Sequence, residues 1–147
     1  MDLKEKFFFL DDENPKGPKF LIKPLSESKE KQIMRESQVR RPKGHGPMDM
    51  FNDRRAGEKK IRATVLGWEK LRKQDLLDMD VLRPATFDEW KQAFKGMDFD
   101  AEIEFNEKNL EILAQHYDKK FMGFLNTCHD DLELIRKREL QEELKNW

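Results

Sequence analysis

The stretch KFFFLDDENPKGPKFLIKPL, residues 6–25, decides the fold class, because it contains two short apolar runs separated by turn-forming residues. The runs at residues 7–10 and 19–23 have the length and the aromatic and branched side chains of β-strands. Between them, NPKG at residues 14–17 suits a β-turn, with Asn at its first position, Pro fixing φ at the second and Gly at the fourth. The sequence therefore predicts a β-hairpin over residues 5–25.

Three consecutive phenylalanines, Phe7, Phe8 and Phe9, open the first strand. Neighbouring side chains of a strand point to opposite faces, so the three rings cannot share one face. At least one ring must contact a helix, a partner or another chain on the opposite face. Because a two-stranded hairpin is marginal in water, we expect it to pack on helices or to pair with another subunit.

Most of the remaining chain has the apolar spacing of α-helices. Ile61, Val65 and Trp68 follow one another at intervals of four and three residues, which predicts a core helix. Thr86 begins the capping-box pattern of a shorter helix, and Asn106 is expected to cap the helix after it. The predicted helices cover about residues 26–39, 53–71, 86–96, 106–128 and 132–147.

These elements predict a mainly α protein of the α+β class, in which an N-terminal two-stranded β-hairpin packs on a bundle of about four to five helices. A chain of 147 residues has room for one ordinary domain, which we place at residues 1–131. Within it we expect a flexible basic loop over residues 40–50, because RRPKGHGP contains nothing apolar to bury. Residues 132–147 form a charged C-terminal helical extension.

The extension has an irregular apolar stripe among dense charges, made by Leu140, Leu144 and Trp147. Such a helix either packs on the domain or projects as an oligomerisation arm, and the sequence leaves both open. A homo-oligomer is therefore one expectation for this chain. The candidate partner-binding residues are Phe7, Phe8, Phe9, Leu140, Leu144 and Trp147.

The charged residues exclude one class of protein, and they are distributed unevenly along the chain. The sequence is 40% charged, but 29 basic and 30 acidic residues nearly cancel, which excludes a polyelectrolyte that binds nucleic acid through its overall charge. Residues 48–73 carry 8 basic and 4 acidic side chains, whereas residues 74–118 carry 4 basic and 12 acidic ones. This division favours docking within the chain, head-to-tail association or a local basic site for a partner.

A nucleic-acid-binding module that uses the basic region 40–62 is the rival function. A flexible arm beside a basic helix start would neutralise several phosphates. The near-zero total charge and the lack of aromatic residues between the basic ones over residues 35–50 argue against it, so we do not expect nucleic acid to be the main partner. The candidate contacts are Arg40, Arg41, Lys43, Arg54 and Arg55.

The sequence predicts a cytoplasmic protein that does not span a membrane. Its longest uninterrupted apolar run covers only residues 7–10, far below the roughly 20 residues of a membrane helix. The N-terminus is charged and lacks the apolar core of a secretory signal. A single cysteine gives no disulfide framework.

No motif predicts an enzyme, a metal site or a cofactor. The sequence lacks the glycine-rich phosphate loops and the G-x-S-x-G nucleophile elbow. His116, Cys128 and His129 lack the paired short spacing of zinc ligands, because adjacent helical residues point about 100° apart. Cys128 falls on the apolar face of a predicted helix, where a thiol is a small buried residue rather than a nucleophile.

Four segments in order resemble the small tail-assembly chaperones and related tail proteins of long-tailed phages and prophages. They are FFFLDD at 7–12, IKPLS at 22–26, ATVLGWE at 63–69 and IEFNEKN at 103–109. The resemblance covers roughly residues 5–130. The helix over about residues 86–96 and the charged tail after residue 131 depart from the pattern of that family, so the former reads as an insertion.

The resemblance implies a non-enzymatic phage or prophage tail assembly protein of the bacterial host cytoplasm. Such a chaperone-like factor binds tail components, notably the long tape-measure protein or the tail tube, until they polymerise. A structural tail or head–tail protein is the alternative within phage biology. A holdase needs accessible apolar surface on a highly charged body, and this composition is compatible with that need.

Overall fold

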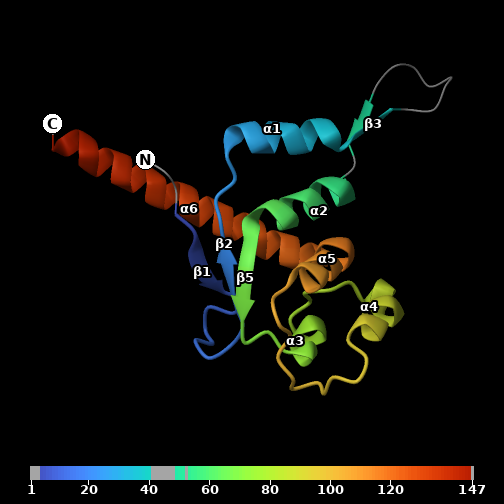
Figure 1. The fold of residues 1–147 in the computed structure, drawn as a ribbon. Helices are drawn as coiled ribbons and strands as arrows, with labels where there is room; N and C mark the ends of the chain where they lie inside the picture. The colour runs from blue at the N-terminus through green and yellow to red at the C-terminus, as the bar shows by residue number, and fades with distance from the viewer. Residues whose placement is uncertain (1–3, 41–48, 52, 147) are drawn as a thin grey trace.

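The computed structural model describes residues 4–40, 49–51 and 53–146, and it contains the predicted hairpin (Figure 1). Strands β1 (Lys6–Phe9) and β2 (Lys19–Ile22) pair antiparallel. The turn between them also forms, since the Gly17 N–H donates to the Asn14 carbonyl at 3.0 Å. The hairpin prediction is therefore confirmed.

A third strand, β5 (Val65–Glu69), joins the sheet where the sequence predicts a helix. It pairs antiparallel with β2, so the strand order is β1-β2-β5. Ile22 pairs with Val65 and Leu21 pairs with Gly67, which leaves Leu66 as the extra residue of a β-bulge. The predicted helix over residues 53–71 is therefore wrong beyond residue 64.

The bulge explains why this strand has the apolar spacing of a helix. In a regular strand the buried residues are two apart. The extra residue resets this alternation, so Val65 and Trp68, which are three apart, are both buried. Two β-branched residues in succession, Thr64 and Val65, followed by Gly67, also weaken the helical alternative.

Two helices, α1 (Glu27–Glu36) and α2 (Asp53–Thr64), lie beside each other near this sheet (Figure 1). Ser26 caps α1, because its Oγ accepts from the Lys29 N–H at 3.2 Å. Ile33 is buried, whereas its neighbour Met34 is exposed. The apolar stripe of α1 is therefore a single residue wide.

Two short strands form at the ends of the segment predicted to be a flexible loop over residues 40–50. Strand β3 (Gln38–Arg40) pairs antiparallel with β4 (Asp49–Phe51), so residues 40, 49 and 50 belong to strands. Strand pairing satisfies backbone N–H and C=O groups that a loop would leave to water. Residues 41–48 lie outside the described part of the chain.

Three short helical segments follow β5: α3 (Lys73–Asp78), the 3₁₀ helix η1 (Pro84–Thr86) and α4 (Phe87–Ala93). The helix predicted over residues 86–96 is present as α4, but its capping box does not form. The Thr86 hydroxyl instead donates to the Arg83 carbonyl at 3.1 Å, because the 3₁₀ turn before α4 places that acceptor three residues back.

The last two helices, α5 (Glu107–His116) and α6 (Lys119–Lys145), are separated by a break at Tyr117. Asn106 caps α5 as predicted, with its side chain accepting from the Asn109 N–H at 2.8 Å. Tyr117 has an extended ψ of 145°, and the Asp118 side chain then caps α6 by accepting from the Lys120 N–H at 2.9 Å. Residues 131 and 132 both lie within α6, so the domain and the C-terminal extension share one helix.

The core lies between the sheet and α6 and continues to α2, α3, α4 and α5. Phe20 is fully buried, and its ring packs against Phe121 and Phe124 of α6 with centroid distances of 5.2 and 5.8 Å. In Figure 1, α6 passes behind the sheet and its C-terminal end projects from the body. The fold is mainly α, with six α-helices and a three-stranded sheet in the described residues.

Gly57 of α2 is buried against Tyr117, the residue that separates α5 from α6. A Cβ at position 57 would lie 2.0 Å from the Tyr117 Oη and 2.5 Å from its Cζ. The ring is held in place because the Arg54 guanidinium stacks on it at 3.7 Å from the centroid. We expect Gly57→Ala to lower the free energy of unfolding by about 1–3 kcal/mol, measured by urea denaturation.

Gly123 of α6 is the matched control, because it is exposed and a Cβ there meets no atom within 4 Å. Gly123→Ala should raise the free energy of unfolding by roughly 0.5–1 kcal/mol, since alanine is the better helix former. Effects of the same sign at both positions would contradict the packing described for Tyr117.

Candidate functional site

One face of the three-stranded sheet carries exposed apolar residues of the kind predicted to bind a partner. The alternation of β1 and β2 places Phe7, Phe9, Lys19 and Leu21 on the same side, with Phe7 paired to Leu21 and Phe9 paired to Lys19. We call these four residues the outer sheet face. Phe7 is 39% exposed, and Phe9 and Leu21 are half-buried.

Lys19 lies across the aromatic part of this face. Its Nζ is 4.7 Å from the centroid of the Phe7 ring and 5.9 Å from that of Phe9, which are cation–π distances. The same ammonium pairs with the Glu69 carboxylate of β5 at 3.2 Å. The outer sheet face is therefore apolar at β1 and charged toward β5.

The opposite face of the sheet is occupied by the core. Phe8 packs against the core cluster, as do Phe20 and Ile22 of β2. Figure 1 shows α6 behind the sheet and no described helix in front of it. Two of the three candidate phenylalanines, Phe7 and Phe9, thus lie on the outer sheet face, and Phe8 lies on the inner one.

The second group of candidate residues lies at the projecting end of α6. Leu140 is 41% exposed and Leu144 is 73% exposed. Trp147 lies outside the described residues. None of the helices in the described part of the chain is long and apolar enough to cross a membrane.

Arg54, one of the candidate nucleic-acid contacts, is engaged inside the protein. Its guanidinium donates to the carbonyls of Tyr117 at 2.5 Å and Gln115 at 2.8 Å, and it stacks on the Tyr117 ring. It thereby satisfies carbonyl groups at the C-terminal end of α5. Burial lowers the pKa of this guanidinium from its ordinary value.

Other basic residues of α2 also have partners within the chain. Lys59 pairs with Glu36 of α1 at 2.7 Å, and Arg62 pairs with Glu111 of α5, which lowers the pKa of that carboxyl. Arg55 lies exposed on α2. Of the remaining candidates, Arg40 belongs to β3, while Arg41 and Lys43 lie outside the described residues.

His116, Cys128 and His129 do not come together. Among the residues that the structure describes, no group of three or more His, Cys, Asp and Glu side chains is arranged to hold a metal ion. Cys128 is buried on the core face of α6, and burial raises the pKa of its thiol to about 12. The buried His129 Nε2 and His116 Nδ1 have no hydrogen-bond partner.

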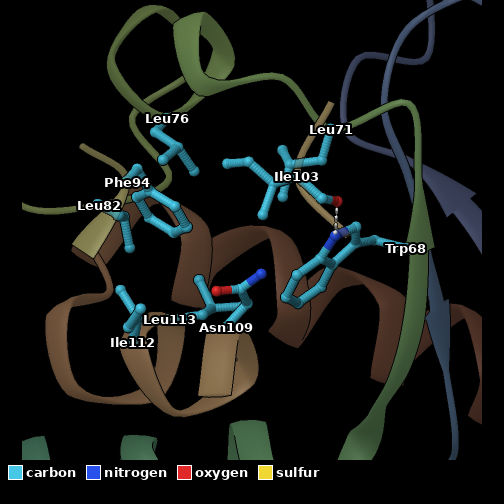
Figure 2. A pocket seen from close by; sticks show the side chains of 9 residues that line it. All are labelled: Trp68, Leu71, Leu76, Leu82, Phe94, Ile103, Asn109, Ile112 and Leu113. Atoms are coloured by element: carbon cyan, nitrogen blue, oxygen red, sulfur yellow. Dashed lines mark hydrogen bonds between the residues drawn. The ribbon is translucent and has the colours of Figure 1, made fainter. Parts of the chain in front are cut away.

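An apolar cavity lies between β5, α5 and the segment before α4, and Figure 2 shows its lining. Its volume of about 10 Å³ is roughly that needed for one water molecule, so it is a packing defect rather than a ligand pocket. The Trp68 indole closes one side and donates to the Ile103 carbonyl at 2.8 Å.

A buried polar cluster at the start of α3 has no counterpart in the sequence analysis. Asp75 is 3% exposed, and it accepts hydrogen bonds from the backbone and the side chain of Arg72. Lys73 is 7% exposed, and its Nζ donates to the Met97 carbonyl at 3.2 Å. These residues attach the acidic segment before α5 to α3. Their neighbours in the sequence are equally charged, so the pattern gave no signal for them.

A comparison of the chain with protein-family models, with curated proteins and with solved structures finds no match.

Cys128 should react slowly in the folded protein. With a pKa of about 12 against an ordinary 9.0, its thiolate fraction near pH 8 is about a thousandfold smaller than in the unfolded chain. We expect a thiol reagent such as DTNB to label Cys128 slowly in buffer and within seconds in urea. Rapid stoichiometric labelling of the native protein would contradict the burial of this side chain.

His129 should make the protein less stable in mild acid. Burial and then repulsion from Lys60 of α2 lower its pKa from 6.5 to about 4, although Asp130 opposes this. Because the folded pKa lies below the unfolded one, the stabilisation is complete above pH 6.5 and is lost as the pH falls toward 4.

A His129→Gln variant tests this dependence, because it removes the titrating ring and keeps a polar side chain. Between about pH 7 and pH 4.5 the wild type should lose roughly 1–2 kcal/mol more unfolding free energy than the variant, allowing for solvent screening. Parallel stability curves for the two proteins would rule out the burial of a neutral His129.

Proposed function

We propose that the protein is a non-enzymatic assembly factor that binds an apolar segment of a partner protein on the outer sheet face. The observation that carries the proposal is the pair of rings of Phe7 and Phe9, which lie with Leu21 on a face that no described helix covers. Exposed apolar surface on a highly charged body is typical of sites for protein contacts.

The position of β1 favours an extended partner segment. β1 is an edge strand of the sheet, so its outer N–H and C=O groups are not paired with another strand of the described residues. A segment that pairs along β1 would obtain backbone hydrogen bonds and would place its apolar side chains beside Phe7 and Phe9. Buried aromatic rings then contribute most of the affinity.

The resemblance to tail-assembly chaperones supplies the proposed partner. We propose that it is a phage tail component, such as the tape-measure protein or the tail tube, which the protein holds in the cytoplasm of the bacterial host. Neighbouring genes for a major tail protein and for a long helical tape-measure protein would support this assignment, and their absence would count against it.

The test is co-expression with a tape-measure fragment, followed by measurement of the soluble, co-purified fraction. Phe7→Ser together with Phe9→Ser should reduce co-purification at least tenfold, because both rings leave the outer sheet face. Met34→Ser is the matched control, since Met34 is 52% exposed on α1 and lies outside this face.

Unchanged co-purification of the Phe7 and Phe9 variant would contradict the proposal that the partner binds the outer sheet face. Detection of the protein in purified phage particles would favour a structural tail or head–tail role over a chaperone. Binding of DNA or RNA that falls steeply with salt, and that is lost when Arg40, Arg41 and Lys43 are neutralised, would favour the nucleic-acid-binding module instead.

A further inference from the structure

The C-terminal part of α6 extends away from the body of the protein. Leu132 is its last fully buried residue, Ile135 is half-buried, and every described residue from 136 onward is exposed. Residues 136–145 alone extend about 15 Å beyond the body at 1.5 Å per residue. We call residues 133–145 the tail helix, and Figure 1 shows it projecting from the molecule.

Apart from the half-buried Ile135, the side chains of the tail helix have no stabilising partner among the described residues. None of them makes a hydrogen bond, an ion pair or a ring contact. Isolated helices shorter than about 12–15 residues are marginal in water, and this segment is helical as the continuation of α6. The tail helix therefore lacks the packing that normally keeps a helix of this length folded.

The order of charges also fails to stabilise an isolated tail helix. Between Glu133 at its start and Lys145 at its end, three basic residues are followed by three acidic residues in the last two turns, where the negative end of the helix dipole disfavours acidic side chains and favours Lys145. Arg138 lies four positions before Glu142, which is the less favourable orientation within a helix, whereas Glu133 lies four positions before Lys137 in the favourable one. The basic group is Arg136, Lys137 and Arg138, and the acidic group is Glu139, Glu142 and Glu143.

The same charge order is complementary to itself when a second copy runs in the opposite direction. In an antiparallel pair of residues 133–145, Glu133 of one tail helix lies opposite Lys145 of the other and Arg136 lies opposite Glu142, whereas a parallel pair places like charges together. Charged residues that flank an apolar seam set the partner and the orientation of paired helices. Leu140 and Leu144 lie one turn apart on the same side of the helix and supply exposed apolar surface for such a seam.

We propose that the tail helix is a self-association surface, on which residues 133–145 pair antiparallel with the same residues of a second copy of this chain. The pairing is two-fold symmetric, so it closes at a dimer and does not build a filament. The interface is small and charged, so the dimer is weak, concentration-dependent and sensitive to salt. This inference does not depend on the proposed function, because it uses none of the outer sheet face.

Sedimentation equilibrium of the full chain tests the proposal with two charge variants. The acidic variant combines Arg136→Glu, Lys137→Glu and Arg138→Glu, and the basic variant combines Glu139→Lys, Glu142→Lys and Glu143→Lys. In each variant almost all charged residues of the tail helix have the same sign. Each variant should therefore self-associate at least tenfold more weakly than the wild type. An equimolar mixture of the two should restore the dimer, because the acidic tail helix of one variant then pairs with the basic tail helix of the other.

The concentration range runs from roughly 10 μM to 1 mM, which covers the affinities that a small interface provides. Leu144→Ser should also weaken the dimer, whereas Met34→Ser on α1 should leave it unchanged. Far-UV circular dichroism and urea denaturation of each variant verify that the body is folded, so that a loss of dimer reports on the tail helix.

Three results would overturn the proposal. They are a wild type that stays monomeric at the highest concentration, variants that dimerise as the wild type does, and a mixture that stays monomeric while the wild type dimerises. The Phe7 and Phe9 variant should dimerise normally, and the charge variants should still capture a tape-measure fragment. The proposed self-association and the proposed binding of a partner can therefore be refuted separately.

Discussion

The packing of Phe20 against three aromatic rings holds the structure together. Its centroid lies 6.0 Å from that of Trp68, 5.2 Å from Phe121 and 5.8 Å from Phe124, so one side chain of β2 joins β5 and α6. A two-stranded hairpin is only marginally stable by itself, and this contact stabilises it by burying its inner face. Once Phe20 is fixed inward, strand alternation sends the side chains of Lys19 and Leu21 outward.

Local signals in the sequence were sufficient for part of the fold. The turn at residues 14–17 and the Asn106 cap depend on neighbouring residues only, and each forms as predicted. β5 depends on a partner 43 or more residues away, and its bulge gives it the apolar spacing of a helix. Thr86 failed as a cap because the 3₁₀ turn before it supplied another acceptor.

The candidate surfaces were predictable to a different extent. Side chains alternate along a strand, so Phe7 and Phe9 must share a face. These two of the four residues of the outer sheet face could therefore be predicted from the sequence. The contribution of Lys19 depends on strand register, and the engagement of Arg54 with the end of α5 depends on the packing of two helices. The charged pattern predicted a helical extension over residues 132–147 but left open whether it packs or projects, and in the structure every described residue from 136 onward is exposed.

The pairing of β2 with β5 also shapes how the chain folds. The β1–β2 hairpin is closed by a short turn and can form early, whereas β5 must find β2 across the whole segment that contains α1, β3, β4 and α2. Each doubling of a loop costs only about 0.6 kcal/mol of closure free energy, so we expect insertions between β2 and β5 to lower the stability of the sheet only slightly. We therefore expect the hairpin to form before β5 joins the sheet, and the connection between β2 and β5 to accept changes in length.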